Sequence, residues 1–189
     1  MANVDNPDGF RVHHSCKPLG KYALLAGLNE TLYVGDVVKK ASSSDPTGMY
    51  QSIQKAGAGV AILGVIVGFE PLEGVAVGSE NLNKMHHTAS TAQFAYVCDD
   101  PHAEFEVQAS GTTIATDCGL NIDLTGSSGS TVTGRSNMEV DTTTINTTST
   151  LQFQVMRHLN RPDNAIGANG RYVVIPNNHQ LNSVGTTGV

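Results

Sequence analysis

Short runs in which apolar and polar residues alternate recur along most of the 189-residue chain. Leu151, Phe153 and Val155 share one face of such a run and two glutamines share the other, which is the period of a strand with one wet face. A second run at residues 172–175 is aromatic or β-branched throughout and indicates a strand covered on both faces. Residues 161–170 between them are rich in turn formers, so we predict a long ordered loop that projects from a two-strand base.

The same patterns predict further strands at residues 22–26, 31–38, 60–69, 93–97, 103–108 and 119–124. Residues 39–48 have the composition of a loop, and residues 49–56 are predicted to form a helical turn or two. Gly64 and Gly68 interrupt the most apolar run and indicate a bent or bulged strand. About ten short strands with almost no helix predict an all-β protein, an antiparallel β-sandwich or barrel of jelly-roll-like or tulip-like topology.

Two polar segments interrupt the strand pattern. Residues 70–90 are irregular and are expected to form a surface excursion. Residues 126–150 have few apolar side chains, and we expect four of them to anchor an extended loop with short strands: Val132, Met138, Val140 and Ile145.

The first twenty residues are polar and punctuated by Pro and Gly, so they cannot fold alone. Phe10 and Val12 nevertheless share one face, which indicates an extended arm lying on another surface. We therefore divide the chain into an N-terminal arm (1–20), a single β-rich domain or two packed β subdomains meeting near residues 70–92 (21–180), and a C-terminal tail (181–189).

Charge and composition exclude some classes of partner. Charged residues make up 15% of the chain, the net charge is −6, and the 11 Lys and Arg are scattered, which disfavours binding to nucleic acid. The N-terminus has no basic region followed by an apolar run, so no signal peptide is expected. The longest apolar stretch, residues 60–69, is too short to span a bilayer, and we expect a soluble protein made in a cytoplasm.

The three cysteines, Cys16, Cys98 and Cys118, are an odd number at wide spacing. Free thiols in a reducing compartment are the favoured interpretation, and a single disulfide is the alternative. Two adjacent histidine pairs, at residues 13–14 and 86–87, lack metal-binding spacing, because neighbours on a strand point to opposite faces. No cofactor is expected.

Glu104 and Glu106 share one face of a predicted strand, as an acid and base pair for glycoside cleavage would. The favoured interpretation is that both are solvated on a wet strand face together with Gln108. No phosphate loop, nucleophile elbow or catalytic cysteine signature is present. We therefore expect no enzyme activity.

Several motifs in order give the chain a family resemblance. They are NPDGFRVH (6–13), GDVV (35–38), YVCDDP (96–101), FEVQ (105–108), GSTVTGRS (129–136), RPDN (161–164) and NNH (177–179). Their order resembles the head decoration, or capsid cement, proteins of tailed bacteriophages, most closely over residues 93–179. Residues 70–90 depart from the family's pattern.

The resemblance implies a structural virion protein, made in the bacterial host cytoplasm, that binds the outer surface of an assembled head and stabilises contacts between major capsid subunits. It implies a homo-oligomer, with a trimer favoured over a dimer, and no nucleic acid or membrane as partner. The arm and the 161–170 loop are the segments expected to contact the shell or a neighbouring subunit, through Phe10, Arg11, Val12, His13, Arg161, Asp163, Asn164 and Asn169. The alternative is a carbohydrate-binding β-sandwich module on a phage surface, although the chain has no Trp for sugar stacking.

Overall fold

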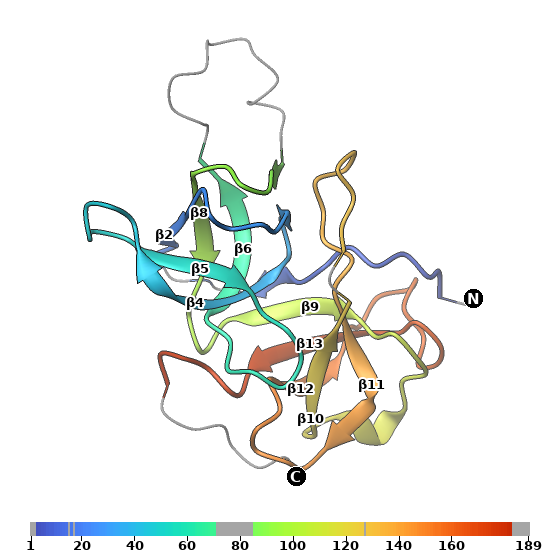
Figure 1. Cartoon of the computed structure of the whole chain (residues 1–189). Helices are drawn as coiled ribbons and strands as arrows, with labels where there is room; N and C mark the ends of the chain where they lie inside the picture. The colour runs from blue at the N-terminus through green and yellow to red at the C-terminus, as the bar shows by residue number, and fades with distance from the viewer. Residues whose placement is uncertain (1–2, 15, 17, 71–84, 127, 183–189) are drawn as a thin grey trace.

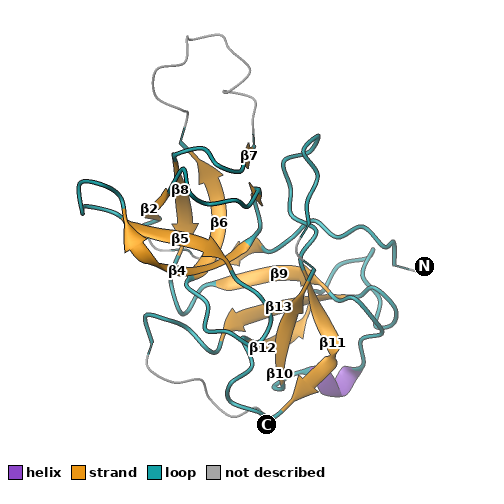
Figure 2. Ribbon diagram, in the orientation of Figure 1, coloured by secondary structure: helices purple, strands orange, loops and turns teal. Residues whose placement is uncertain are grey.

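The computed structural model describes residues 3–14, 16, 18–70, 85–126 and 128–182, and this part of the chain is almost entirely strands and loops (Figure 1). Its helical structure is one 3-10 turn at Ala115–Asp117 (Figure 2). The strands pair antiparallel with one exception, a parallel contact between β2 (Gly20–Leu24) and β5 (Gln51–Lys55). The all-β prediction is thereby confirmed.

The first structural unit is a closed barrel, seen at the upper left of Figure 1. Its strand order is β2-β5-β4-β6-β8, with β4 at Val37–Ser44, β6 at Gly64–Phe69 and β8 at Gln93–Cys98. Aliphatic side chains fill its interior: Leu24, Leu32, Val38, Ile53, Leu63, Ile66, Ala95 and Val97. A two-stranded sheet of β3 (Leu32–Tyr33) and β7 (His86–His87) lies beside the barrel.

The second unit is a six-stranded sheet of order β1-β9-β13-β12-β10-β11. Its strands are β1 (Arg11–His14), β9 (Glu104–Gln108), β10 (Asn121–Thr125), β11 (Glu139–Asn146), β12 (Phe153–His158) and β13 (Arg171–Pro176). The sheet curls, because Ala109, directly after β9, forms a bridge with Val140 of β11, and the amide of Ser110 donates to the Val140 carbonyl at 2.9 Å. One face of the curled sheet therefore encloses an apolar core.

The chain crosses between the two units twice: from the sheet to the barrel after β1, and back from the barrel to the sheet between β8 and β9 at residues 99–103. One apolar cluster crosses this junction and joins barrel residues such as Val37 and Val65 to sheet residues such as Phe105 and Phe153. The domain limits inferred from the sequence stay a prediction, since continuous packing makes no boundary obvious.

A buried glutamine also joins the two units. Gln152 is fully buried, and its carboxamide donates to the carbonyls of Gly57 and Val60 at 2.8 and 2.9 Å and accepts from the Leu124 amide at 3.0 Å. Its backbone amide donates to the Asp123 carboxylate at 3.0 Å. Because every polar atom of this carboxamide is bonded, it can be buried at little cost and fixes the loop after β5 against the sheet.

Several local predictions are confirmed. The strands predicted on either side of residues 161–170 are β12 and β13, which pair antiparallel. The glycine-interrupted run contains β6, whose pairing with β8 shifts register between Ile66 and Gly68, as expected of a bulged strand.

Two predictions for the barrel are wrong. The segment 49–56 contains strand β5 (Gln51–Lys55) instead of a helical turn, and β4 extends to Ser44, into the segment 39–48 that was predicted as a loop. The polar side chains there bond across the strand pair: the Ser52 hydroxyl donates to the Ser43 carbonyl at 2.6 Å, and the Gln51 carboxamide donates to the carbonyls of Ala41 and Ser43. These bonds allow polar residues to form a strand. A prediction that relies on the spacing of hydrophobic residues does not detect such a strand.

Other differences concern single residues. Val132, expected to anchor the 126–150 loop, is 94% exposed, whereas Met138 and Val140 are fully buried as predicted. The short strand β7 was not predicted. Most of the 70–90 excursion, residues 71–84, lies outside the described residues.

The favoured interpretation of the cysteines is also wrong for two of the three. Cys16 and Cys98 form a disulfide across 82 residues of sequence, and Cys118 is a free, exposed thiol. The bond ties the end of the arm to the last residue of β8, next to the junction between barrel and sheet. Wide spacing concealed this pairing, because only the fold brings the two Cα atoms to 6.0 Å.

We predict that Cys16→Ser lowers the free energy of unfolding by about 4 kcal/mol, because the disulfide closes a long loop in the unfolded chain. Urea denaturation with and without reductant measures the effect, and Cys118→Ser is the matched control that should leave stability unchanged. Equal midpoints for oxidised and reduced protein would show that the bond does not constrain the chain.

We further predict opposite outcomes for two alanine substitutions within β6. A Cβ at Gly64 would lie 2.1 Å from the backbone oxygen of Cys98, so Gly64→Ala must displace a paired strand and should cost about 3 kcal/mol. A Cβ at Gly68 meets no atom within 4 Å, so Gly68→Ala should change stability by less than about 1 kcal/mol. Chemical denaturation of both variants tests the assignment, and equal losses would contradict it.

Candidate interaction surface

The N-terminal arm lies on the chain's own sheet. Its strand β1 pairs with β9, with Arg11 opposite Glu106 and Val12 opposite Phe105. The ring of Phe10 is 2% exposed and stacks on Phe153, with 4.6 Å between ring centroids. Phe10 therefore anchors the arm in the core, and its assignment to a contact with another molecule is corrected.

Asp8 of the arm is the centre of a charged network on the outer face of the sheet. Its carboxylate lies 2.8 Å from the guanidinium of Arg171, 3.2 Å from that of Arg11 and 3.9 Å from that of Arg135. The side chains of Asp8 and Arg171 are 17% and 14% exposed, so this ion pair is partly shielded from water. One carboxylate thus joins the arm, β13 and the loop before β11.

The network continues through Glu106 of β9. This carboxylate lies 3.3 Å from Arg171 and 3.1 Å from Arg161, and Arg161 also contacts Asp163 at 3.2 Å. A separate pair joins Arg157 and Glu104 at 2.7 Å. All five arginines of the sequence therefore take part in ion pairs on this sheet.

The expectation of a wet face on β9 is consequently wrong for two of its three residues. Glu106 is 7% exposed and Gln108 is 1% exposed, because the arm covers them. The carboxamide of Gln108 accepts from the Asn6 amide and donates to Asp5, both at 3.2 Å. Glu104 keeps a more exposed position beside Arg157, with 24% of its side chain accessible.

The loop of residues 161–170 is held against the arm and does not project freely. The carboxamide of Asn3 donates to the carbonyls of Ala165 and Ala168 at 2.8 Å and accepts from the Ala165 amide at 2.8 Å. Within the loop, the Asn164 carboxamide bonds the Leu159 carbonyl and both backbone groups of Arg171. Asparagine side chains therefore fix both the shape and the position of this loop.

A hollow of about 370 Å³ lies where the arm meets the loop. Eight residues line it: Asn3, Val4, Asn6, Arg161, Asp163, Asn164, Asn169 and Arg171. We call this feature the arm–loop hollow. The predicted site residues Arg161, Asp163, Asn164 and Asn169 all belong to it, whereas Arg11, Val12 and His13 lie exposed on β1.

Sequence reasoning missed the four other lining residues and Asp8. Asn3 and Arg171 are more than 160 positions apart, and nothing in their local sequence marks them as neighbours. The strand pattern around β9 and β13 was correct, but the position of the arm across them depends on the tertiary fold. Asp8 is one polar residue in a polar arm, so nothing in the local sequence indicated its arginine partners.

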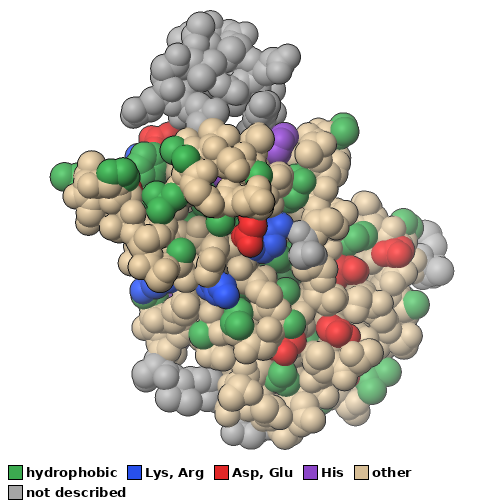
Figure 3. Space-filling model, viewed as in Figure 1, with side chains coloured by type: hydrophobic (Ala, Val, Ile, Leu, Met, Phe, Trp, Pro, Cys, Tyr) green, Lys and Arg blue, Asp and Glu red, His purple; other side chains and the backbone are tan. Residues whose placement is uncertain are grey.

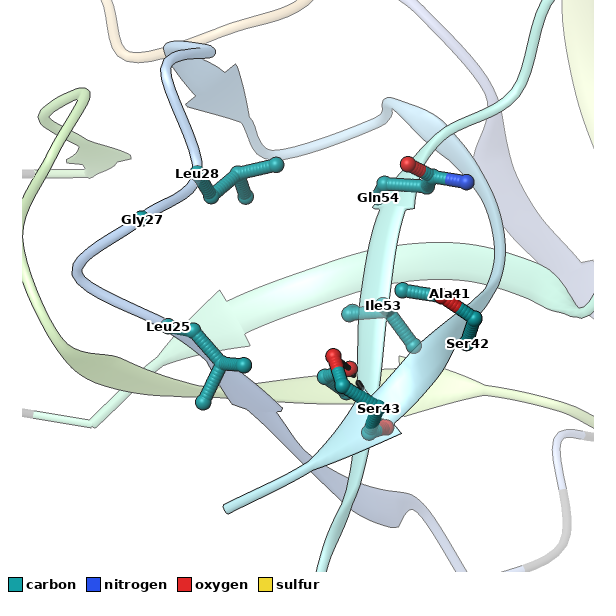
Figure 4. A pocket seen from close by; sticks show the side chains of 9 residues that line it. Leu25, Gly27, Leu28, Ala41, Ser42, Ser43, Ile53 and Gln54 are labelled. Carbon is teal, nitrogen blue, oxygen red and sulfur yellow. Dashed lines mark hydrogen bonds between the residues drawn. The ribbon is translucent and has the colours of Figure 1, made fainter. Parts of the chain in front are cut away.

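A second hollow of about 320 Å³ lies on the barrel, between β5 and the segment that follows β2 (Figure 4). Leu25, Leu28 and Ile53 line it together with Ser43 and Gln54. The parallel pairing of β2 with β5 is limited to Ala23 and Ser52, so the strands separate at this point. The residues that line this hollow include no charged group.

The charges around Glu104 and Glu106 disfavour the glycosidase arrangement. The Arg157 guanidinium bonds Glu104 and holds the pKa of this carboxyl below its ordinary value, and Glu106 lies between two arginines. A general acid needs the opposite environment, one that keeps its proton near neutral pH. These two carboxylates act as ion-pair partners.

The histidine pairs occupy different surroundings. His13 and His14 are exposed on β1. His86 stacks on Tyr33, with 5.8 Å between ring centroids, whereas His87 points inward and burial lowers its pKa. Within the described residues, no three His, Cys, Asp or Glu side chains are grouped as a metal site requires.

We compared the described surface with the features that bind carbohydrates, nucleic acids and membranes. All ten Tyr and Phe residues lie in the described part of the chain, and none is an exposed ring. On the face shown in Figure 3, Lys and Arg form small separate groups instead of a continuous basic patch. Among the described residues, no helix is long and apolar enough to cross a membrane.

Comparison of the chain with protein-family models, with curated proteins and with solved structures found no match.

We predict that Asp8→Asn loosens the arm and lowers the free energy of unfolding by about 2 kcal/mol, because the partly buried Arg171 loses the nearer of its two charged partners and keeps only Glu106. Hydrogen exchange of the amides in β1 and urea denaturation measure the two effects. Asp163→Asn is the control, since the Asp163 side chain is 72% exposed and its ion pair should contribute less than about 1 kcal/mol. Unchanged protection of β1 in Asp8→Asn would contradict the role given to the network.

Proposed function

We propose that this chain is a head decoration protein that binds the outer surface of a tailed-phage capsid and stabilises contacts between major capsid subunits. The proposal starts from the order of motifs along the sequence, which resembles that family, and from an all-β fold suited to it. It places the protein on the virion, as a homo-oligomer with a trimer favoured.

One observation supports the proposal best: the arm and the 161–170 loop, from opposite ends of the chain, form a single surface that ion pairs and hydrogen bonds hold together. Asp8, Arg171, Glu106 and Arg161 connect the arm to the loop, and Asn3 adds three hydrogen bonds to the same loop. Ordering a loop on binding costs free energy, so a surface ordered in advance binds more tightly for the same contacts. This arrangement suits adhesion to a fixed partner.

The position of β1 adds to this surface. It is the terminal strand of the six-stranded sheet, and its four residues are exposed. A terminal strand can extend a sheet into a neighbouring chain through main-chain hydrogen bonds. Several such contacts in a symmetric oligomer act together, so modest individual interfaces can hold a shell under internal pressure.

The described residues favour adhesion over the two other functions considered. Glu104 and Glu106 are paired with arginines, which disfavours glycoside cleavage. All ten Tyr and Phe residues are buried or half-buried, which disfavours a carbohydrate-binding module that stacks sugars on exposed rings. We therefore propose no enzyme activity and no cofactor.

The test is binding to heads of the phage whose genome encodes the chain. Purified protein should co-sediment with assembled heads and appear as added density on their outer surface in electron micrographs. Deletion of residues 2–7 should reduce the affinity about ten-fold or more, the effect of losing about 1.4 kcal/mol. This deletion keeps Asp8 and Phe10, because the buried Phe10 belongs to the fold and removal of the whole arm would expose the core.

Gln54→Ala, in the hollow on the barrel, is the control and should leave head binding unchanged. Thermal denaturation of each variant verifies the fold. If the intact protein never associates with heads, the proposed function is wrong. If it binds equally well without residues 2–7, the contact lies elsewhere on the molecule.

A further inference from the structure

The eight residues of the arm–loop hollow differ in whether their polar groups are already engaged. Asn3 and Asn164 each use the donors and the acceptor of their carboxamides within the chain. Arg171 bonds Asp8, Glu106 and the carbonyl of Asn6. These three side chains build the hollow and have little capacity left for another molecule.

Two other carboxamides are not engaged. Asn6 and Asn169 both line the hollow, and neither carboxamide has a hydrogen-bond partner in the part of the chain that the structure describes. Asn6 belongs to the arm and Asn169 to the loop, so the two residues line the hollow from different segments of the chain. Hydrogen bonds fix both backbones. The Asn6 amide donates to Gln108 and its carbonyl accepts from Arg171, and the Asn169 amide donates to the Gly111 carbonyl at 2.9 Å.

The charges of the hollow are balanced. Arg161 contacts Glu106 and Asp163, so its guanidinium is already neutralised, which disfavours capture of a free anion. No aromatic ring lines the hollow, which disfavours sugar stacking. Val4, 78% exposed, adds an aliphatic contact at the same place.

A carboxamide presents one acceptor and two donors in a plane, so it can pair with the N–H and C=O groups of a peptide backbone. Two such groups beside an aliphatic side chain match an extended chain, whose main chain needs bonds and whose alternate side chains need apolar contact. The volume of about 370 Å³ is in the range of a specific site, about 300–1,000 Å³.

We infer that the arm–loop hollow binds an extended segment of the shell protein through its main chain, with Asn6 and Asn169 as the recognising side chains. This inference rests on the proposed function and specifies how its partner is held. Recognition of main-chain groups tolerates variation in the partner's side chains, which suits a shell whose subunits meet in several quasi-equivalent environments.

The double variant Asn6→Ala with Asn169→Gly tests the inference. Asn169 has a φ of 54°, a conformation that glycine adopts without strain, so this substitution removes the carboxamide and keeps the backbone. The backbone bonds of Asn6 do not need its side chain. The melting temperature should therefore stay unchanged, while head affinity falls about ten-fold, as expected for the loss of two hydrogen bonds.

The matched control is Gln54→Ala, which removes a carboxamide from the other hollow and should leave affinity unchanged. A second measurement does not depend on heads: synthetic peptides that tile the shell protein are added while the side-chain amide signals of Asn6 and Asn169 are followed by NMR. One peptide should shift both signals, and the double variant should not bind it.

The outcomes separate the two proposals. If the intact protein binds heads and the double variant binds equally well, the inference is overturned and the proposed function stands. If heads are not bound and no peptide shifts the signals, both fail. If the double variant instead dissociates an oligomer in sedimentation, or if a bacterial surface polysaccharide shifts the two signals, the occupant is a second copy or a glycan and the inference is wrong.

Discussion

The ion pair between Asp8 and Arg171 is the contact on which the outer surface of this protein depends. It joins the N-terminal arm to a strand near the other end of the chain, at 2.8 Å and largely sheltered from water. Exposed ion pairs contribute little to stability, but a shielded arginine left without its partner is costly. The pair therefore acts mainly by holding the arm in one position on the sheet. Glu106 and Arg161 connect the same network to the loop.

This surface needs a rigid base, and the two β units supply it by different means. The barrel is filled by aliphatic side chains and closed by its own strands, whereas the curled sheet encloses a core that continues into the barrel. Gln152 and the Cys16–Cys98 disulfide join the units at separate places. The disulfide holds the arm at Cys16 and the charged network holds it at Asp8, so the arm is attached to the rest of the molecule at two places.

The properties of the molecule are consistent with attachment to a partner. Glu104 and Glu106 are paired with arginines, none of the Tyr and Phe residues is fully exposed, and asparagines line the hollow between the arm and the loop. Asparagine is well suited to such a place, because its short carboxamide binds backbone groups without adding net charge. The same residue type shapes the loop through Asn164 and, by our inference, recognises the partner through Asn6 and Asn169.

The sequence by itself determined the all-β class, the strands on both sides of the 161–170 loop and the bulge in β6, because alternation and glycine placement are local properties. It also marked the arm and the loop as segments of interest. It did not determine β4 beyond Val38 or β5, since serine and glutamine there are stabilised by cross-strand bonds that only pairing creates. The Cys16–Cys98 bond, the covered carboxylate of Glu106 and the meeting of Asn3 with the loop were decided by the tertiary structure alone. Each joins positions far apart in sequence, and a contact across 55 to 162 residues leaves no trace in the local pattern from which strands are predicted.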